Sequence, residues 1–202
     1  MDWSEYNRPL SINQTFWSSK TGRLRKLDTP VVGSKDLALK GDLIVLVGGS
    51  SEVFQKYEKF LNEIGKTVIY LGADGNGHKM KLAINLYLGL FAESFSEALA
   101  FSQKFGFDAK IFVETINKTP HRNYISEIKG PKILEGNFEP VFSLNNLFKD
   151  LELINEQITK TEAILPMTKV AIKEYSEAVQ NGEGKKDFSV IALEIQRKNG
   201  LA

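Results

Sequence analysis

The stretch Gly72-Ala-Asp-Gly-Asn-Gly-His-Lys-Met-Lys-Leu-Ala-Ile-Asn85 decides how the chain is organised, because it turns a glycine-rich loop into a long apolar helix. Lys81 and Asn85 lie four residues apart, so on a helix their side chains project from one face. The segment 82–92 is apolar nearly all the way round, which is typical of a buried helix. A buried amide without a partner costs roughly 1 to 3 kcal/mol. Either Asn85 is a satisfied core amide and Lys81 extends to solvent, or both line a cleft that binds a small polar molecule.

Composition narrows the class of protein. The 202 residues are 42% hydrophobic and 25% charged, which is ordinary for a globular protein of one large domain or two small ones. A net charge of +1 gives no general attraction to nucleic acid or to an anionic membrane. Because the chain has no cysteine and two histidines, disulfides, cysteine nucleophiles and thiolate or histidine-rich metal sites are excluded. With no apolar signal core and no run long enough to span a bilayer, we expect a cytoplasmic protein.

The first part of the chain alternates as an α/β protein does. A β-branched and leucine run at 42–49 predicts a strand buried on both faces, and a capped helix to about Ile64 and a strand at 66–71 follow it. The segment 24–32 predicts a short strand that ends near Pro30, because proline cannot donate to a β-ladder. Residues 1–23 have neither a helical nor a strand period.

The rest of the chain predicts helices and no strand. The expected helical segments are 77–105, 108–116, 123–129, 144–161, 166–180 and 187–198, with a loop at 131–141 that glycine and proline punctuate. The sequence therefore divides into a partial α/β segment, 1–74, and an all-helical domain, 75–202, which begins with the long helix that joins the two.

The glycine cluster at the start of the long helix has two interpretations. Gly72, Gly75 and Gly77 follow a strand and precede a helix, which is where a dinucleotide-binding loop would lie. Their order does not fit G-x-G-x-x-G, and no second strand ending in an acid follows. A turn into a buried helix is the better interpretation.

The remaining charged residues and the two histidines also have ordinary structural explanations. Lys149 and Asp150 flank the apolar stripe of a helix, and adjacent charges in such a place usually form a solvated edge. His78 could reach the same cleft as Lys81, but a surface histidine near a helix start is the better interpretation. We expect His121 in an exposed loop.

Four segments, in the right order, resemble the β-hydroxyacid dehydrogenase family, which includes 3-hydroxyisobutyrate dehydrogenase and glyoxylate/succinic semialdehyde reductases. The segment 75–85 fits the family's G-x-G-x-x-x-K-x-x-x-N, and Lys149-Asp-Leu-Glu-Leu153 is similar to its K-D-L-x-L. Asp28-Thr-Pro-Val-Val-Gly-Ser34 looks like its D-A-P-V-S-G-G substrate loop, and Lys185-Lys-Asp-Phe-Ser189 fits its C-terminal helix start. The resemblance runs from about residue 24 to the end.

The resemblance implies hydride transfer between a nicotinamide, of NAD or NADP, and a small 3-hydroxyacid or semialdehyde. It implies that Lys81 is the general acid/base, a role that suits a lysine whose pKa is lowered toward neutrality, and that Asn85 orients the substrate and Lys81. The further residues that it implies are Lys149 and Asp150 for the cofactor, and Val32, Gly33, Ser34 and Gly77 for the substrate, with the loop backbone holding the carboxylate.

Two departures from the family pattern modify this expectation. Val32 stands where the family has serine, so a hydroxyl contact to the carboxylate is lost. The family's G-x-G-x-x-G half is missing from residues 1–30, so we expect an N-terminally shortened member with reduced or absent cofactor affinity. Its fold would be an α/β remnant of a Rossmann-type domain, of about three strands, followed by an all-α domain and joined to it by a long helix.

Alternative functions follow from the same departures. The main alternative is a non-catalytic dimerising module derived from such an enzyme. An imine-reductase-like variant is weaker, because those relatives usually lack lysine at the position of Lys81. Strands such as 43–47 would expose an apolar edge unless residues 1–23 or another subunit cover it, so we expect a homodimer or a larger homo-oligomer.

Overall fold

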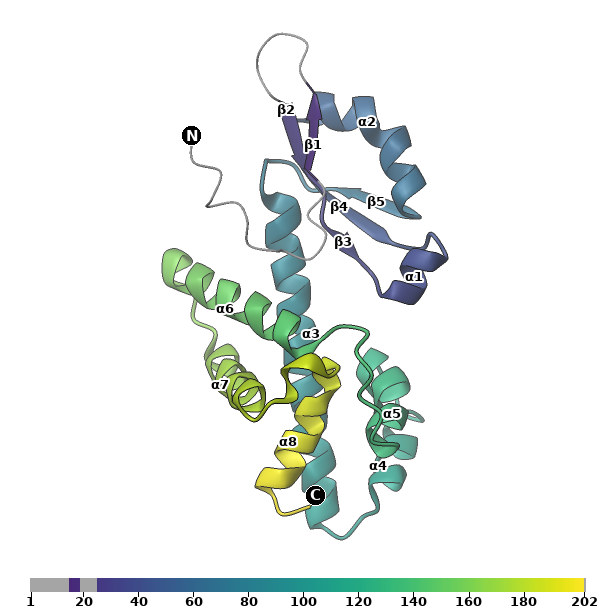
Figure 1. The fold of residues 1–202 in the computed structure, drawn as a ribbon, viewed down its shortest axis with the longest axis vertical. Coiled ribbons are helices and arrows are strands. Elements are labelled where there is room, and N and C mark those ends of the chain that lie inside the picture. The colour runs from purple at the N-terminus through teal and green to yellow at the C-terminus, as the bar shows by residue number, and fades with distance from the viewer. Residues whose placement is uncertain (1–14, 19–24, 202) are drawn as a thin grey trace. The chain divides into compact units, whose positions relative to one another are not determined.

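A computed structural model describes residues 15–18 and 25–201, which belong to two compact units, 1–83 and 84–202 (Figure 1). The boundary between the units falls inside one long helix, at Ala83 and Ile84. No helix in this described part of the chain is both long and apolar enough to cross a membrane.

Unit 1 contains a five-stranded sheet. Its central strand, β4 (Ile44–Gly49), pairs in parallel with β5 (Thr67–Tyr70) and antiparallel with β2 (Arg25–Asp28) and β3 (Val31–Val32). The strand β1 (Thr15–Ser18) pairs with β2 and extends the sheet on that side. The predicted α/β remnant is therefore confirmed, although β1 lies in the segment 1–23, where no strand was expected; the rest of that segment lies outside the described residues.

The strands β2 and β3 form one antiparallel ladder along β4, and Thr29 and Pro30 interrupt it. Leu27 lies opposite Gly49 and Val31 lies opposite Val45, so the register is the same on both sides of the gap. The amide of Leu46 donates to the carbonyl of Pro30 at 2.9 Å, which continues the ladder where proline itself cannot donate. The single strand expected near Pro30 is thus two short strands.

The helix α2 (Ser51–Ile64) forms where the sequence predicted a capped helix, and it packs against β2, β4 and β5. A short helix, α1 (Lys35–Leu39), was not predicted; the hydroxyl of Ser34 accepts a hydrogen bond from the amide of Leu37 at its start, at 3.4 Å. The core between sheet and helix is apolar and nearly free of solvent, and it is formed by Leu27, Val31, Val45, Val47, Val53 and Leu61.

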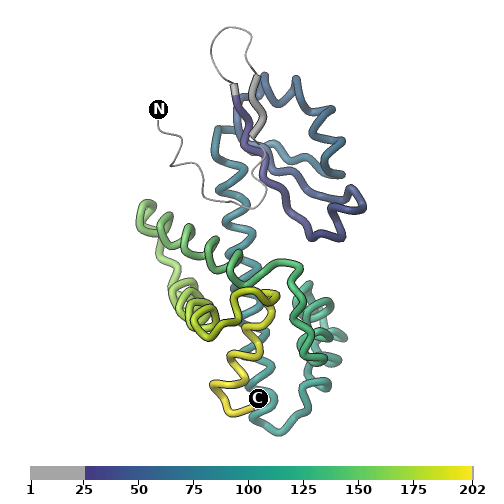
Figure 2. Tube along the Cα trace, viewed as in Figure 1, coloured from purple at the N-terminus to yellow at the C-terminus, as the bar shows by residue number. Residues whose placement is uncertain are grey.

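The described elements of unit 2 are helices joined by loops, and Figure 2 shows its chain from α3 (Asn76–Lys104), in teal, to α8 (Ile191–Lys198), in yellow. The helices α6 and α7 pack against each other, and α8 packs against α7. Five of the predicted helices are confirmed within a few residues, and the predicted 123–129 helix forms as the π-helix η2. The elements are α3 (Asn76–Lys104), α4 (Ala109–Ile116), η2 (Ile125–Lys129), α5 (Gly130–Leu134), α6 (Leu144–Thr161), α7 (Pro166–Gln180), η3 (Glu183–Lys185), η4 (Phe188–Val190) and α8 (Ile191–Lys198).

The loop predicted at 131–141 is wrong in its first part, where α5 forms. Pro131 lies in the first turn of this helix, where its missing N–H costs nothing. A Cβ on Gly130 would lie 2.9 Å from a methyl group of Val113, so the glycine permits close packing with α4 and does not break the helix.

A buried ion pair holds three segments of unit 2 together. The ammonium of Lys129 lies 2.8 Å from both carboxylate oxygens of Asp187, and both side chains are almost free of solvent. Asp187 also accepts hydrogen bonds from the amides of Val141 and Phe142. Burial alone would raise the pKa of Asp187, but its bonds to Lys129 and Ser189 lower it below the usual range. The carboxylate therefore stays charged and ties η2, the following loop and the start of η4 to one another.

Candidate active site

A carboxylate from the sheet holds the first turn of α3. Asp28, the last residue of β2, accepts a hydrogen bond from the amide of Gly75 at 2.9 Å and another from the amide of His78 at 3.0 Å. Amides at a helix start lack partners within the helix and carry the positive end of its dipole, so a carboxylate there is stabilising. These amides are consequently not available to a pyrophosphate, which agrees with the interpretation of the glycine cluster as a turn into a helix.

The side chain of His78 takes part in the same contact. Its Nδ1 lies 3.1 Å from Oδ2 of Asp28, and the side chain is 35% exposed. His78 is thus a partly exposed histidine near a helix start, as expected, but the sequence did not reveal that an acid 50 residues away is its partner. His121 is exposed in a turn, as predicted.

Two glycines make the space that Asp28 occupies. A Cβ on Gly48 would lie 2.2 Å from Oδ1 of Asp28, and a Cβ on Gly77 would lie 2.7 Å from Oδ2. Gly77, which the family resemblance implied for substrate binding, is buried against this carboxylate. The structure therefore gives both glycines a role in packing around Asp28.

Lys81 reaches the segment that the resemblance identified as the substrate loop. Its Nζ donates a hydrogen bond to the carbonyl of Val31 at 2.8 Å, and the residue is half-buried. The simple picture of a lysine that extends to solvent is wrong. The ammonium instead lies at the beginning of the loop 31–34, one helical turn after His78.

The other residues of this loop have local structural roles as well. Val32 is half-buried and presents no hydroxyl group. Gly33 has a φ of +146°, which favours glycine, and a Cβ there would lie 2.6 Å from Leu43. The hydroxyl of Ser34 accepts from the amide of Leu37 and thereby caps α1. A ligand carboxylate would therefore meet mainly backbone groups in this loop.

Asn85 is buried, as the sequence predicted, and its partner is Asp150 on α6. The side-chain nitrogen of Asn85 lies 2.6 Å from Oδ2 of Asp150, and these residues are 7% and 5% exposed. The expectation that Asp150 belongs to a solvated edge is wrong. Because an ionised carboxylate can only accept, it fixes the amide with Nδ2 toward Asp150 and leaves Oδ1 of Asn85 as an acceptor for another group.

Lys149 differs from its neighbour. Its side chain is 31% exposed, and its Nζ lies 3.8 Å from Oδ1 of Asp150. A half-exposed ammonium can interact with a polar or anionic group of a cofactor. Of the two residues implied for the cofactor, Lys149 is accessible to solvent, whereas the buried Asp150 holds Asn85. The cofactor role of both residues stays a prediction.

Glu93 is a buried acid on α3 that no sequence motif indicated. The residue is 7% exposed, and neither carboxyl oxygen has a hydrogen-bond partner. Burial, and then the charges of Glu174 and Glu97, raise its pKa to about 8, against an opposing effect of Lys198. The one signal in the sequence was an acid among apolar residues in the middle of a helix predicted to be buried.

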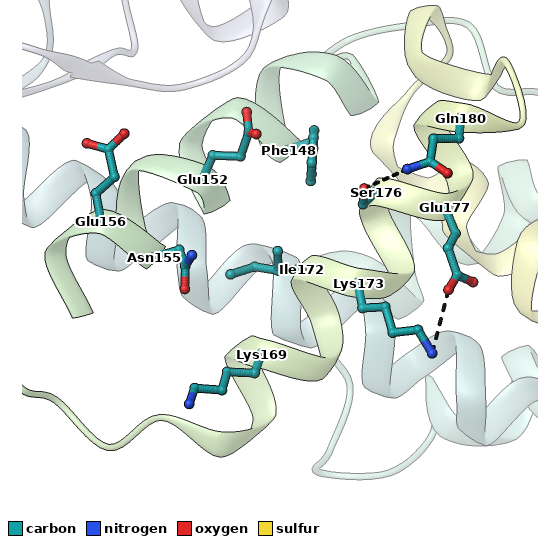
Figure 3. Close-up of a pocket in the computed structure, with 10 residues that line it drawn as sticks. All are labelled: Phe148, Glu152, Asn155, Glu156, Lys169, Ile172, Lys173, Ser176, Glu177 and Gln180. Carbon is teal, nitrogen blue, oxygen red and sulfur yellow. Dashed lines mark hydrogen bonds and ion pairs between the residues drawn. The ribbon is translucent and has the colours of Figure 1, made fainter. Parts of the chain in front are cut away.

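A groove of about 630 Å³ lies between α6 and α7 (Figure 3). Phe148 and Ile172 give it apolar walls, and Lys173 pairs across one turn of α7 with Glu177 at 3.6 Å. The side chains that the sequence predicted for the site are not among those that line this groove.

Two family models match this chain. The model described as NAD-binding of NADP-dependent 3-hydroxyisobutyrate dehydrogenase matches residues 75–194. The model described as the NAD binding domain of 6-phosphogluconate dehydrogenase matches residues 9–72. The two matches meet at the glycine turn that precedes α3.

Named relatives match over most of this chain. Glyoxylate/succinic semialdehyde reductase 2, chloroplastic, of Arabidopsis thaliana is 33% identical over 165 residues, which is 82% of this chain and 46% of that protein. The 2-(hydroxymethyl)glutarate dehydrogenase of Eubacterium barkeri is 33% identical over 177 residues, 87% of this chain and 59% of that protein. The chain thus spans about half to three-fifths of the length of these relatives.

A solved structure shares the fold. The crystal structure of 3-hydroxyisobutyrate dehydrogenase from Salmonella typhimurium superposes with a TM-score of 0.76 at 23% identity, over 83% of this chain and 59% of that one. This similarity concerns the fold alone. It agrees with a Rossmann-type remnant followed by a helical domain.

Proposed function

Because this chain belongs to the β-hydroxyacid dehydrogenase family, we propose that it takes part in NAD(P)-dependent interconversion of a small hydroxyacid, such as a 3-hydroxyacid, and the corresponding aldehyde or semialdehyde. The membership rests on the family model that matches residues 75–194, more than half of the chain, and it confirms the resemblance inferred from the sequence. The descriptions of both family models support NAD or NADP as the cofactor.

The observation that carries the proposal is the position of Lys81. Its ammonium is held 2.8 Å from the Val31 carbonyl, at the loop that matches the family's substrate loop. An ammonium at this place can give a proton to the oxygen of a bound aldehyde as it becomes a hydroxyl, and the neutral amine can take the proton back in the reverse direction. When bound, the nicotinamide supplies or accepts the hydride.

Asn85 has a supporting role in this proposal. Asp150 holds its nitrogen, so Oδ1 of Asn85 is presented as an acceptor one helical turn after Lys81. Such an acceptor can orient a substrate hydroxyl. The backbone of Gly33 and Ser34 is proposed to bind the substrate carboxylate, since Val32 offers no hydroxyl, and Lys149 is proposed to meet the cofactor.

Replacement of the lysine tests the proposal. We expect Lys81→Ala to lower kcat for NAD(P)H-dependent reduction of glyoxylate or succinic semialdehyde by about 10²- to 10⁴-fold, the usual contribution of a general acid/base. Lys79→Ala is the matched control, because Lys79 is exposed on the same helix and bonds only weakly to Asn76, at 3.5 Å. Unchanged turnover in Lys81→Ala would refute the proposed role.

A second candidate, a non-catalytic dimerising module, is supported by exposed aromatic side chains near the end of α3. Phe101, Phe105 and Phe107 are 65%, 69% and 56% exposed, and burying them against another subunit would be favourable. A protein of this kind would show no turnover with any of these aldehydes, and Lys81→Ala would leave its assembly unchanged. Turnover that depends on Lys81 excludes a purely structural function.

A further inference from the structure

Two contacts join the same pair of segments in unit 1. Asp28 contacts His78, and Val31 contacts Lys81, and each pair is separated by 50 residues in the sequence. Three residues of extended chain, from 28 to 31, therefore run beside three residues of helix, from 78 to 81. The two segments are held together most firmly at Asp28, which is 6% exposed and whose carboxylate makes three contacts with the start of the helix.

The lengths of the two segments show what each contact contributes. Three residues of extended chain advance about 10 Å, at about 3.3 Å per residue. Three residues of helix rise only about 4.5 Å, at about 1.5 Å per residue. The long side chain of Lys81 spans the difference, so its Nζ reaches Val31 only while the first turn of α3 stays beside Asp28.

We propose that Asp28 is a positioning residue for Lys81. Its carboxylate fixes the first turn of α3 against the end of β2 and thereby presents the Lys81 ammonium at the carbonyl of Val31. The inference rests on the proposed function for its chemical meaning, since Lys81 is the group that would exchange the proton. Asp28 itself is buried among its own hydrogen-bond partners, so it acts on Lys81 through the start of α3.

The surroundings of Asp28 explain why a carboxylate is required. Three donors converge on it, namely the amides of Gly75 and His78 and the ring nitrogen Nδ1 of His78. An aspartate can accept all three, whereas an asparagine has one acceptor oxygen and turns an NH₂ group toward the other donors. Because the carboxylate accepts, Nδ1 of His78 carries the proton in this contact. Gly48 and Gly77 leave room for it, since a Cβ on either would overlap its oxygens.

The test measures the reactivity of the Lys81 amine, which requires no turnover. The full chain is treated with trace acetic anhydride, and the acetylation rate of each lysine is read by peptide mass spectrometry. In Asp28→Asn we expect the Lys81 rate to rise about threefold to tenfold, the change in population that losing one net hydrogen bond produces. The rates of Lys66 and Lys79, which are exposed in the same unit, should not change.

Asp74→Asn is the matched control. Asp74 lies in the same glycine turn, but it is exposed and pairs with Lys26 at 3.0 Å. We expect this variant to leave the Lys81 rate at its wild-type value. A role of Asp28 in capping the helix alone would raise amide hydrogen exchange at 75–78 in Asp28→Asn without changing the acetylation of Lys81, and that result overturns the proposal.

A second variant tests the proposal if Asp28→Asn unfolds the unit, which a loss of hydrogen-exchange protection at the amides of β4 would reveal. His78→Ala removes one of the three contacts and keeps both backbone bonds to Asp28. We expect a rise in the Lys81 rate of about twofold to threefold in this variant, within the range for one weakened hydrogen bond. An unchanged Lys81 rate in folded His78→Ala overturns the positioning role.

The outcomes separate this inference from the proposed function. Increased Lys81 reactivity in Asp28→Asn, in a chain whose wild type reduces no aldehyde, supports the positioning role and refutes the reductase. Where the wild type is active, kcat should fall in Asp28→Asn with KM for the aldehyde unchanged. An active wild type with an unaltered Lys81 rate in the variant refutes the positioning role alone.

Discussion

Glu93 is the residue whose protonation the fold perturbs most plainly. Its carboxyl group is buried on α3 without a hydrogen-bond partner, and burial together with Glu174 and Glu97 raises its pKa from 4.5 to about 8. The neutral acid is therefore the form that the folded protein favours near neutral pH. In the unfolded chain the same group ionises near its ordinary value.

This difference predicts how stability depends on pH. Between about pH 4.5 and pH 8 the folded state holds a proton on Glu93 that the unfolded state has released, so this contribution to stability is complete below about pH 4.5 and is lost as the pH rises to about 8. We expect Glu93→Gln to remove this dependence and to be more stable than the wild type by a few kcal/mol near pH 8, since a tenfold change in protonation equilibrium is about 1.4 kcal/mol.

Urea unfolding at about pH 5 and about pH 8 measures this effect. Glu135→Gln, at an exposed acid, is the control and should follow the wild type. If the wild type and Glu93→Gln lose the same stability between the two pH values, the account of Glu93 is wrong.

For single residues, burial could be predicted from the sequence, but contacts with distant residues could not. The burial of Asn85 was predictable because the helix around it is apolar on every side. Its partner Asp150 was not, because the pair is 65 residues apart and a charge beside an apolar stripe usually faces water. The same limit applies to His78, whose contact with Asp28 arises only when the strand and the helix are brought together.

At the scale of single elements, the start of α3 packs closely against Asp28, and this close packing requires a glycine at position 77. A Cβ on Gly77 would come within 2.7 Å of Asp28 Oδ2 and 2.9 Å of the Leu46 carbonyl. We expect Gly77→Ala to destabilise unit 1 by about 2 to 3 kcal/mol, as overpacking does. Hydrogen exchange of the amides of β4 measures the change.

Gly89→Ala is the matched control on the same helix. A Cβ there would lie 3.6 Å from Leu151, an ordinary contact, and alanine favours a helix over glycine by up to about 1 kcal/mol. This variant should be as stable as the wild type or slightly more stable. Equal stability of Gly77→Ala and the wild type would show that the helix start is not packed as described.

Most elements could be predicted because hydrophobic periodicity and capping residues act locally. The strands β4 and β5 and the helices α2, α6 and α7 agree with their predicted ranges within two residues. α5 was missed because glycine and proline were taken as loop markers, whereas Gly130 allows contact with Val113 and Pro131 suits a first turn. Tertiary packing decided the structure of that segment.

At the scale of the whole chain, the spaced motifs were informative because each combines residues that act together. The segment 75–85 contains the turn, Lys81 and Asn85, and the family that it indicated is confirmed. The expectation of a homo-oligomer remains a prediction. An uncovered strand edge gives less reason to expect it, because β1 pairs with β2 and covers one edge of that strand.

The transfer of a labelled hydride tests the central claim most directly. The wild-type chain is incubated with NADH or NADPH in which deuterium replaces both hydrogens at C4 of the nicotinamide, together with succinic semialdehyde or glyoxylate, and the product is analysed by mass spectrometry. A reductase of this family should form the hydroxyacid with deuterium on its carbinol carbon, and Lys81→Ala should form almost none. Unlabelled or undetectable hydroxyacid with both cofactors and both aldehydes would contradict the account.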